Sequence, residues 1–329
     1  MAYTTIDKPT DYFETILYTG NGGTLNVGGL DFQPDWVWYK NRSATANHGL
    51  FDAVRGATKL IQSNNNSAEQ TVSGVTSFNS DGFSLGADSD GNGNGNNIVS
   101  WNWKETATAG FDIVSYTGNG SNRTISHSLS AVPSMMIVKN RDADEEWTVY
   151  HHKNTSAPAT DYLALNTTGA TTDSDNRWND TAPTSSVFTL GTTGNVNANG
   201  QKFIAYLFAE KQGYSKFGSY TGNGNANGTF VYTGFKPAFY MIKRTDTTGA
   251  WIIKDNLRPG FNVNGSYLVA NDNIAEATGS GNVASDELSN GFKIRGTSSA
   301  LNTSGGTYIY MAFAEQPFVS STGIPTTAR

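Results

Sequence analysis

The amino-acid sequence predicts an all-β fold built from three tandem β-sandwich domains. The first observation is an internal repeat, because the pentapeptide Tyr-Thr-Gly-Asn-Gly occurs at residues 18–22, 116–120 and 220–224 and the same features follow each copy. The second observation is composition, since 36 Gly and 12% aromatic residues accompany only 15% charged residues. Short strands joined by Gly and Asn turns have this composition, whereas helices favour Ala, Leu, Glu and Lys.

The first repeat predicts seven short strands in chain order. Its opening strand leads into the Tyr-Thr-Gly-Asn-Gly turn, which we interpret as the first hairpin of the sandwich. Pro34 comes before the most apolar strand, a position where the missing backbone N–H does least harm. A Gly- and Asn-rich loop at residues 88–97 precedes the last strand. The predicted strands cover residues 13–18, 24–27, 36–39, 50–51, 60–61, 83–86 and 98–103.

The second and third repeats present the same features in the same order. Pro133 and Pro237 occupy the position of Pro34. Each repeat has about a hundred residues, enough to bury its own core, and the short junctions between repeats favour a compact cluster. We therefore predict an N-terminal arm at residues 1–12, β-sandwiches at 13–109, 110–213 and 214–318, and a C-terminal tail at 319–329.

Charge and residue content argue against several classes of function. The formal net charge of −6 is unlike that of a general nucleic-acid binder, which has a basic face. The chain has no cysteine, so disulfides and thiolate metal sites are excluded. We expect no membrane span and no classical secretion signal, because no sufficiently long apolar run is present. We also expect no cofactor, since phosphate loops and dinucleotide fingerprints are missing.

Charged residues shared by all three repeats are more typical of a fold than of one special site. A Lys follows the central apolar strand, and a Glu follows the last strand of each repeat. They form structural pairs or strand caps under the favoured interpretation, and a ligand-binding pair present three times under the other. These residues are Lys40, Lys139, Lys243, Glu105, Glu210 and Glu315.

The loop at residues 88–97 resembles the start of a calcium-binding loop. Asp88, Asp90 and Asn92 place oxygen ligands at alternate positions, as an EF-hand loop does. The twelfth position holds Val99 instead of an acidic bidentate ligand, and no flanking helices are predicted. A Gly/Asn-rich hairpin loop is the alternative interpretation, and it is the favoured one.

Two further features of the second repeat are candidates for ligand contact. A cluster of four carboxylates follows its third strand, at Asp142, Asp144, Glu145 and Glu146. Paired carboxylates can hydrolyse glycosidic bonds, but no neighbour predicts a raised pKa, so we interpret the cluster as a solvated turn and expect no enzyme. Trp178 has no counterpart in the other repeats. It either stacks on a sugar ring or anchors its loop, and the anchor is favoured.

Several motifs occur together along the whole chain. They are the Tyr-Thr-Gly-Asn-Gly turn, a Pro before an apolar strand that ends in Lys-Asn-Arg, the strands NGFKIRG and YIYMAFAEQPF, and the terminal sequences TTIDKPTDYFETILYTGNG and FVSSTGIPTTAR. This combination resembles a family of repeat proteins from tailed phages, especially marine ones, described as virion or tail-fibre-like structural proteins. The resemblance implies a virion location, a jelly-roll or lectin-like topology and release by lysis, and it transfers no catalytic residues.

Three hypotheses about function follow from the repeats and the resemblance. The favoured one is a tail fibre, spike or knob that serves host attachment, bound to other virion proteins through a terminal arm and to host surface glycan through its loops. We expect a homo-oligomer in the particle. The alternative is a capsid decoration or head-fibre protein, in which three similar domains mimic a trimer. The third is a polysaccharide depolymerase that uses the carboxylates at residues 142–146.

Overall fold

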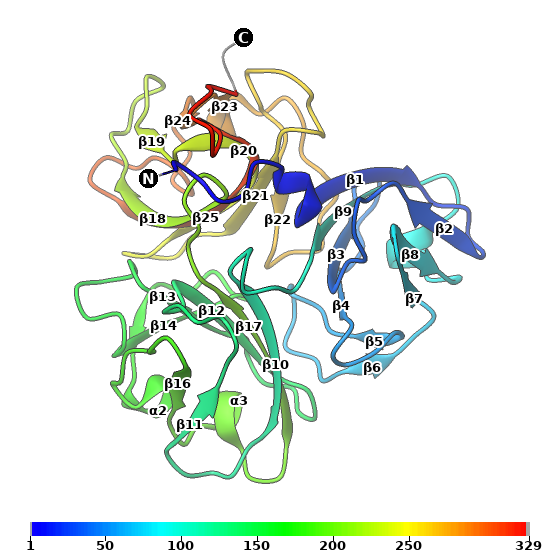
Figure 1. Cartoon of the computed structure of the whole chain (residues 1–329), viewed down its shortest axis with the longest axis vertical. Helices are drawn as coiled ribbons and strands as arrows, with labels where there is room; N and C mark the ends of the chain where they lie inside the picture. Colours follow the sequence, from blue (N-terminus) through cyan, green and yellow to red (C-terminus); the bar gives the residue numbers. More distant parts are fainter. Residues whose placement is uncertain (1, 327–329) are drawn as a thin grey trace.

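The computed structural model describes residues 2–326, and its regular structure is almost entirely β-strand, which confirms the predicted all-β class. Three groups of sheets surround a common centre (Figure 1). We name them by the predicted repeats: lobe 1 (residues 13–109), lobe 2 (110–213) and lobe 3 (214–318). The few helices are short. They are η1 (Pro9–Asp11), α1 (Ser89–Asn92), α2 (Asp175–Trp178), α3 (Gly194–Asn197) and η2 (Gly281–Val283).

Each lobe contains one larger antiparallel sheet in which the opening strand pairs with the last strand, and the last strand pairs with the central strand. The order is β1-β9-β3-β4 in lobe 1, β10-β17-β12-β13-β14-β15 in lobe 2 and β18-β25-β20-β21-β22 in lobe 3. The strands are β1 (Phe13–Thr19), β3 (Trp36–Asn41), β4 (Gly49–Asp52), β9 (Asn97–Trp103), β10 (Phe111–Thr117), β12 (Met135–Asn140), β13 (Thr148–His151), β14 (Asp161–Ala164), β15 (Thr172–Asp173), β17 (Lys202–Phe208), β18 (Ser215–Thr221), β20 (Phe235–Arg244), β21 (Trp251–Asp255), β22 (Leu268–Val269) and β25 (Thr307–Pro317).

A smaller sheet packs on the outer face of each larger sheet and completes a sandwich. These sheets have the orders β2-β8-β7, β11-β16 and β19-β24-β23, and a two-stranded sheet, β5-β6, adds to lobe 1. A separate cluster of buried hydrophobic residues fills each sandwich. The strands are β2 (Leu25–Gly28), β5 (Lys59–Leu60), β6 (Gln70–Thr71), β7 (Val75–Asn79), β8 (Gly82–Leu85), β11 (Arg123–Ser126), β16 (Val187–Leu190), β19 (Phe230–Tyr232), β23 (Ser285–Leu288) and β24 (Gly291–Ile294).

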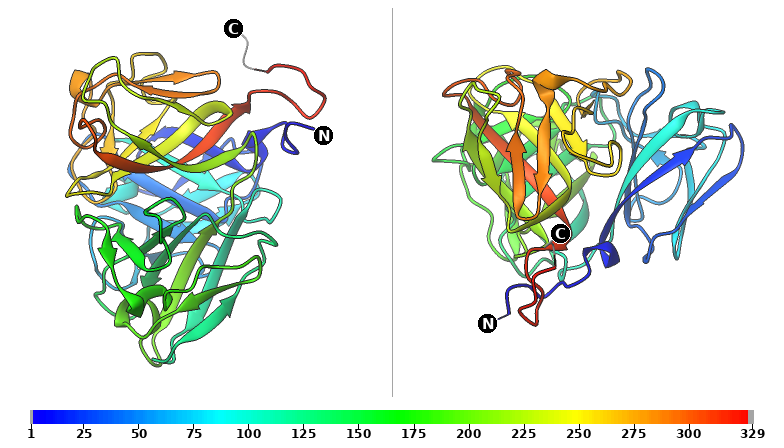
Figure 2. Two further views of the ribbon diagram at one scale, coloured as in Figure 1. Left: turned by 90° about the vertical axis from the view of Figure 1, so that its left-hand side faces the viewer. Right: turned by 90° about the horizontal axis from the view of Figure 1, so that it is seen from above.

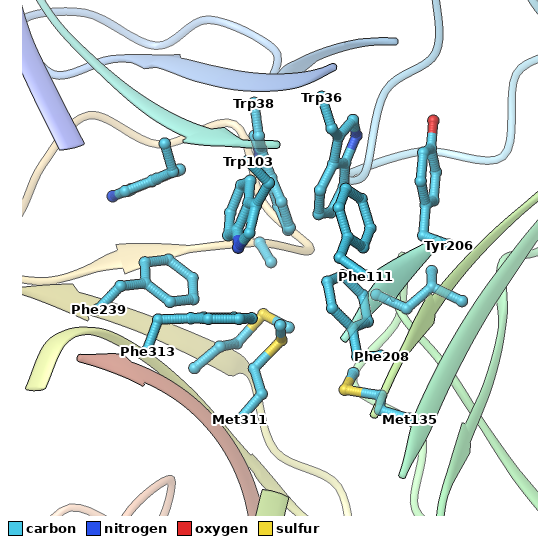
Figure 3. Close-up of a cluster of buried hydrophobic side chains, with 14 of the residues drawn as sticks. Trp36, Trp38, Trp103, Phe111, Met135, Tyr206, Phe208, Phe239, Met311 and Phe313 are labelled. Atoms are coloured by element: carbon cyan, nitrogen blue, oxygen red, sulfur yellow. The ribbon is translucent and has the colours of Figure 1, made fainter. Parts of the chain in front are cut away.

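The largest buried cluster lies between the lobes and draws on all three larger sheets (Figure 3). Side chains alternate along each strand, so Met135 faces this shared centre while Met136 faces the sandwich of lobe 2. Trp36 of lobe 1 stacks on Tyr206 of lobe 2, with ring centroids 4.5 Å apart. Each sheet is thus buried on both faces. Each lobe buries a core of its own within its sandwich, as expected for repeats of this length, and all three lobes share a further core at the centre.

The seams between lobes form a closed ring, because each lobe donates a ring N–H to the lobe before it. The donor is the first residue of β21 or the residue immediately before β4 or β13, and the acceptor is a backbone carbonyl. In chain order, His48 Nε2 donates to Val269 at 3.0 Å, Trp147 Nε1 to Gln62 at 2.9 Å and Trp251 Nε1 to Ala164 at 2.9 Å. Lobe 1 contacts lobe 3, lobe 3 contacts lobe 2 and lobe 2 contacts lobe 1. Three equivalent head-to-tail contacts between lobes therefore close a ring within a single chain.

The Tyr-Thr-Gly-Asn-Gly turn is a corner between two sheets, so its interpretation as a hairpin is wrong. In lobe 1 the strand before the turn, β1, pairs with β9, while the strand after it, β2, pairs with β8. The same holds in lobes 2 and 3. A hairpin would have kept both strands in one sheet. The repeated turn instead carries the chain from the larger sheet to the smaller one.

Candidate functional site

The predicted calcium loop is part of the framework of lobe 1. Asp88 caps the single turn α1, and its carboxylate accepts hydrogen bonds from the Asp90 N–H, at 3.2 Å, and from the Tyr39 hydroxyl. The Asn92 side chain is buried and donates to the backbone carbonyls of Gly23 and Gly86, at 2.6 and 2.9 Å. The loop is therefore a helical turn with structural partners for Asp88 and Asn92, and neither the calcium-loop nor the hairpin interpretation describes it. Across residues 2–326, no group of three or more His, Asp or Glu side chains is arranged to hold a metal ion.

The carboxylate loop at residues 142–146 lies in the seam between lobes 2 and 1. Asp144 accepts a hydrogen bond from the Ala68 N–H at 2.8 Å, and Asp142 accepts one from the Lys202 N–H at 2.8 Å. The backbone carbonyls of Asp144 and Glu145 accept further bonds from Asn66 and Lys139, while the Glu146 carbonyl faces Asn195 at 3.5 Å. The loop is more than the solvated turn that we expected, because it joins two lobes.

Trp178 is a buried anchor and is not available to a ligand. Its side chain is 1% exposed, and its indole N–H donates to the Asp161 carbonyl at 3.0 Å. The ring lies edge-on to Tyr150, within the cluster that fills the sandwich of lobe 2. The sugar-stacking interpretation is therefore wrong. The structure has the residue in the anchoring role, at the end of α2.

The three repeated lysines are buried, and each ammonium group binds backbone carbonyls. Lys139 donates to Asn66 of lobe 1 at 3.0 Å, and Lys243 donates to Thr168 of lobe 2 at 3.2 Å. Lys40 donates to the carbonyl of its neighbour Asn41 at 2.7 Å. Burial lowers the pKa of each lysine to about 8. Two of the three lysines thus hold adjacent lobes together.

The repeated glutamates do not pair with these lysines in the described residues. Glu105 accepts a hydrogen bond from the Ile113 N–H at 3.0 Å, and burial raises its pKa to about 7. Glu210 forms an ion pair with Lys216 at 2.6 Å, and Glu315 forms one with Lys236 at 2.7 Å. The predicted Lys–Glu pair is therefore wrong. Glu105 and Glu210 have partners near the junction that follows the last strand, whereas Glu315 lies within β25 and pairs with a residue of β20.

The two terminal segments lie together beside lobe 3 (Figure 2). Ile6 is buried in the shared centre, and the Tyr3 hydroxyl donates to the Gly234 carbonyl at 2.7 Å. Asp7 accepts a hydrogen bond from the Ser321 N–H at 2.6 Å. The described arm and tail are thus packed against the body and against each other.

The most distinctive outer surface lies on β19 of lobe 3, where Phe230 is 42% exposed and Tyr232 is 53% exposed. Between them, the buried Val231 faces Phe292, as Val27 faces Phe83 in lobe 1 and Ile125 faces Phe188 in lobe 2. At the positions of Phe230 and Tyr232, lobe 1 has Asn26 and Gly28, and lobe 2 has Thr124 and Ser126. Sequence reasoning missed this pair. A strand-by-strand alignment of the repeats would have found it, because two large apolar side chains replace small polar ones.

A hollow of about 310 Å³ borders this surface. Tyr232, Tyr3 and Gln212 line it together with the ion-paired Glu210 and Lys216. A sugar ring has apolar C–H faces and polar hydroxyls, so aromatic rings beside carboxylate, ammonium and amide groups suit its binding. We call Phe230, Tyr232 and this hollow the aromatic surface. A second, larger hollow of about 700 Å³ lies on the same lobe, lined by Lys236, Glu287, Leu288, Ser289, Asn290, Glu315, Gln316 and Thr326.

The fold and these sites define a three-lobed, all-β protein with a shared core. The chain belongs to the family described as "Domain of unknown function (DUF7483)", whose model matches residues 8–317. No curated protein sequence matches the chain. No helix within residues 2–326 is long and apolar enough to cross a membrane.

Proposed function

We propose that the chain is a structural and adhesive protein of a tailed-phage virion, placed on the particle surface in a tail fibre, spike or knob. The observation that carries this proposal is the closed ring of three lobes around a shared core. Residues common to the repeats, such as the buried lysines, bind backbone groups within the body. Repetition is thus used to build a rigid body, and the lobes differ on their outer surfaces.

Host attachment is assigned to the aromatic surface of lobe 3. Exposed Tyr and Phe side chains are typical of binding surfaces, since they bury a large area while losing little conformational entropy. Only lobe 3 has aromatic residues at these two positions of its smaller sheet. The ligand class is a surface glycan of the host. Attachment to other virion proteins is assigned to the terminal segments, which lie side by side next to lobe 3.

A purified particle tests the proposal. Mass spectrometry of the virion should detect the chain, and a cryo-EM map should place a three-lobed density of this shape outside the capsid or on the tail. The same preparation treated to remove loosely bound protein serves as the control. Absence of the chain from the washed particle would contradict the virion role.

A second candidate, capsid decoration, is favoured by one observation. The ring of three similar lobes has the pseudo-threefold character that a threefold position of a capsid would accept. Copy number separates the two roles, because a tail component is present at a low copy number and a decoration protein at one that matches the capsid lattice. The depolymerase alternative has no comparable support, since Asp142 and Asp144 accept backbone hydrogen bonds in or near a seam.

A further inference from the structure

A buried polar cluster lies inside lobe 3, between its larger and smaller sheets. Tyr240 comes from β20, Lys254 from β21 and Glu287 from β23, while Asn264 lies in the segment that bridges to β23. Tyr240, Lys254 and Asn264 are fully buried, and Glu287 is 7% exposed. Ionisable groups at such positions are costly unless they are paired or have a chemical role.

The other lobes show that the sandwich does not require this cluster. Tyr240 and Lys254 are direct partners across β20 and β21. The corresponding cross-strand partners are Val37 and Phe51 in lobe 1, and Met136 and Tyr150 in lobe 2. Glu287 faces Phe292, and the equivalent position in lobe 1 holds Phe78, which faces Phe83. A Lys and a Glu therefore replace side chains that are apolar or aromatic elsewhere in the same chain.

Lys254 and Glu287 both contact Asn264, the first at its backbone and the second at its side chain, and the Tyr240 hydroxyl donates to Glu287 Oε1 at 2.6 Å. Lys254 Nζ donates to the backbone carbonyl of Asn264 at 2.7 Å, which holds the amine against this residue. Asn264 Nδ2 donates to Glu287 Oε1 at 2.9 Å and to the Asp255 carbonyl at 3.2 Å. Asn264 Oδ1 accepts a hydrogen bond from the Ser266 N–H at 3.0 Å. The Asn264 amide nitrogen is thus hydrogen-bonded to the Glu287 carboxyl group and its oxygen to the Ser266 N–H. The Lys254 amine is bound to the backbone of the same residue.

The protonation states suit a reaction between these groups. Burial lowers the pKa of Lys254 to about 7, so a large share of the amine is uncharged and nucleophilic near neutral pH. Burial raises the pKa of Glu287, which favours the protonated carboxylic acid. A neutral amine and a neutral acid are the forms required to attack an amide and to release its nitrogen as ammonia.

We propose that Lys254 and Asn264 form an intramolecular isopeptide bond, with Glu287 as the acid–base residue. Lys254 Nζ attacks Asn264 Cγ, a C–N bond forms, and the electron pair of the carbonyl moves onto Oδ1, where the Ser266 N–H stabilises the developing negative charge. Glu287 takes a proton from Nζ and supplies one to Nδ2. The Cγ–Nδ2 bond breaks, the carbonyl reforms and ammonia leaves. One amide replaces another, so no oxidant or other reactant is needed.

The bond ties the two sheets of lobe 3 together at the base of an exposed loop. Lys254 belongs to the larger sheet, and Asn264 pairs with Ser285 of the smaller sheet. The loop between them carries Phe261, whose side chain is 75% exposed. A covalent cross-link at this position fixes the loop and resists separation of the sheets, as a disulfide would in a chain with cysteine. This role is independent of the proposed place in a virion.

Intact mass and tryptic mapping of the folded full-length chain test the proposal. The expected mass is lower than that of the unreacted chain by one ammonia. Trypsin does not cleave after an acylated lysine, so residues 245–293 should appear as one fragment, with Arg258 protected by the following Pro259. Release of residues 245–254 as a separate peptide, with the full mass of the chain, would overturn the proposal.

Two variants and one side reaction complete the design. Lys254→Met removes the nucleophile and Glu287→Gln removes the acid. The measured mass of each variant should therefore equal the mass calculated from its sequence, with no loss of ammonia. In Glu287→Gln, trypsin should also release residues 245–254. Asn264 precedes Gly265, so a succinimide could also release ammonia. That product leaves Lys254 cleavable and persists in Lys254→Met, an outcome that counts against the cross-link. Where a variant fails to fold, the fragment pattern of the parent chain decides.

Discussion

Asn92 accepts a hydrogen bond on its side-chain oxygen from the backbone N–H of Asn21, at 2.9 Å. Asn197 and Asn119 repeat this contact in lobe 2 at 3.0 Å, and Asn302 and Asn223 repeat it in lobe 3 at 2.9 Å. The donor in each case is the Asn of the Tyr-Thr-Gly-Asn-Gly turn. A buried Asn inside each lobe therefore holds the repeated corner in place.

Replacing Asn92 with Ala should destabilise the chain by about 2–4 kcal/mol, since the Asn21 N–H and the carbonyls of Gly23 and Gly86 each lose a partner. Urea unfolding followed by tryptophan fluorescence measures the change. Asn94→Ala, at an exposed position two residues away, is the matched control and should change stability by less than about 0.5 kcal/mol. Equal effects of the two substitutions would mean that the corner does not depend on Asn92.

The same corner requires glycine at two positions of the turn. A Cβ added to Gly20 would lie 2.3 Å from the Gly93 carbonyl oxygen, and Gly22 has a φ of +72°.

The sequence alone identified the repeat and the all-β class, because turn residues and strand residues are local signals. It did not identify the corner, because pairing β1 with β9 depends on contacts between residues about eighty positions apart.

Buried side chains were the other limit of prediction from sequence. Trp178 and Asp142 were candidates because they are absent from the other repeats, yet both have structural partners. Comparing the sequences of the repeats identifies residues that occur in one lobe alone, but it does not show whether such a residue lies on the surface or in the core. The packing of each residue in the fold supplies that information: Tyr232 on β19 is exposed, whereas Trp178 in α2 is buried.

The seam between lobes 3 and 1 contains a buried ion-pair network, and we predict that its loss destabilises the fold more than the loss of a more exposed pair within lobe 3. Glu276 of lobe 3 binds Arg42 of lobe 1 and Arg258 of its own lobe, and its side chain is 5% exposed. Glu276→Gln should therefore cost about 2–4 kcal/mol, because two guanidinium groups lose their buried partner. The control is Asp246→Asn at the more exposed pair with Arg244, where we expect less than about 1 kcal/mol. Thermal unfolding of both variants at low and high salt provides the comparison. Similar losses at both sites would contradict the role given to this seam.

Two buried histidines predict that acid weakens the fold. His48 Nδ1 accepts from Trp38 Nε1 at 2.8 Å and Nε2 donates to Val269, so the neutral ring is required. His151 is held in the same way between the Lys153 N–H and the Tyr310 carbonyl. Burial lowers the pKa of both to about 3.

The unfolded chain binds protons at these residues below its ordinary pKa of about 6.5, while the folded chain does not until about 3, so stability falls as the pH drops through this window. At pH 5 the expected loss is about 2 kcal/mol for each histidine. The unfolding free energies of the parent chain and of His48→Gln/His151→Gln, measured at pH 7 and pH 5, isolate this contribution because carboxylates titrate in both. An identical pH dependence in the two chains would show that the histidines are not buried in their neutral form.

The aromatic surface predicts a loss of glycan binding without a loss of stability. Phe230→Thr together with Tyr232→Ser gives lobe 3 the side chains that lobe 2 carries at the same positions. Both residues are exposed, at 42% and 53%, so unfolding free energy should change by less than about 0.5 kcal/mol per residue. Binding to host surface polysaccharide, measured by biolayer interferometry, should fall at least about tenfold, which corresponds to about 1.4 kcal/mol.

Phe261→Ser is the control for this experiment, because Phe261 is the more exposed ring but does not line the hollow beside Tyr232. Phe261→Ser should leave polysaccharide binding unchanged if contact with the sugar depends on the position of the aromatic ring as well as on its exposure. Loss of binding in the control, with retention in the double variant, would move the glycan site to the loop between β21 and β22. Loss in both would indicate that the two regions of lobe 3 contact one extended chain.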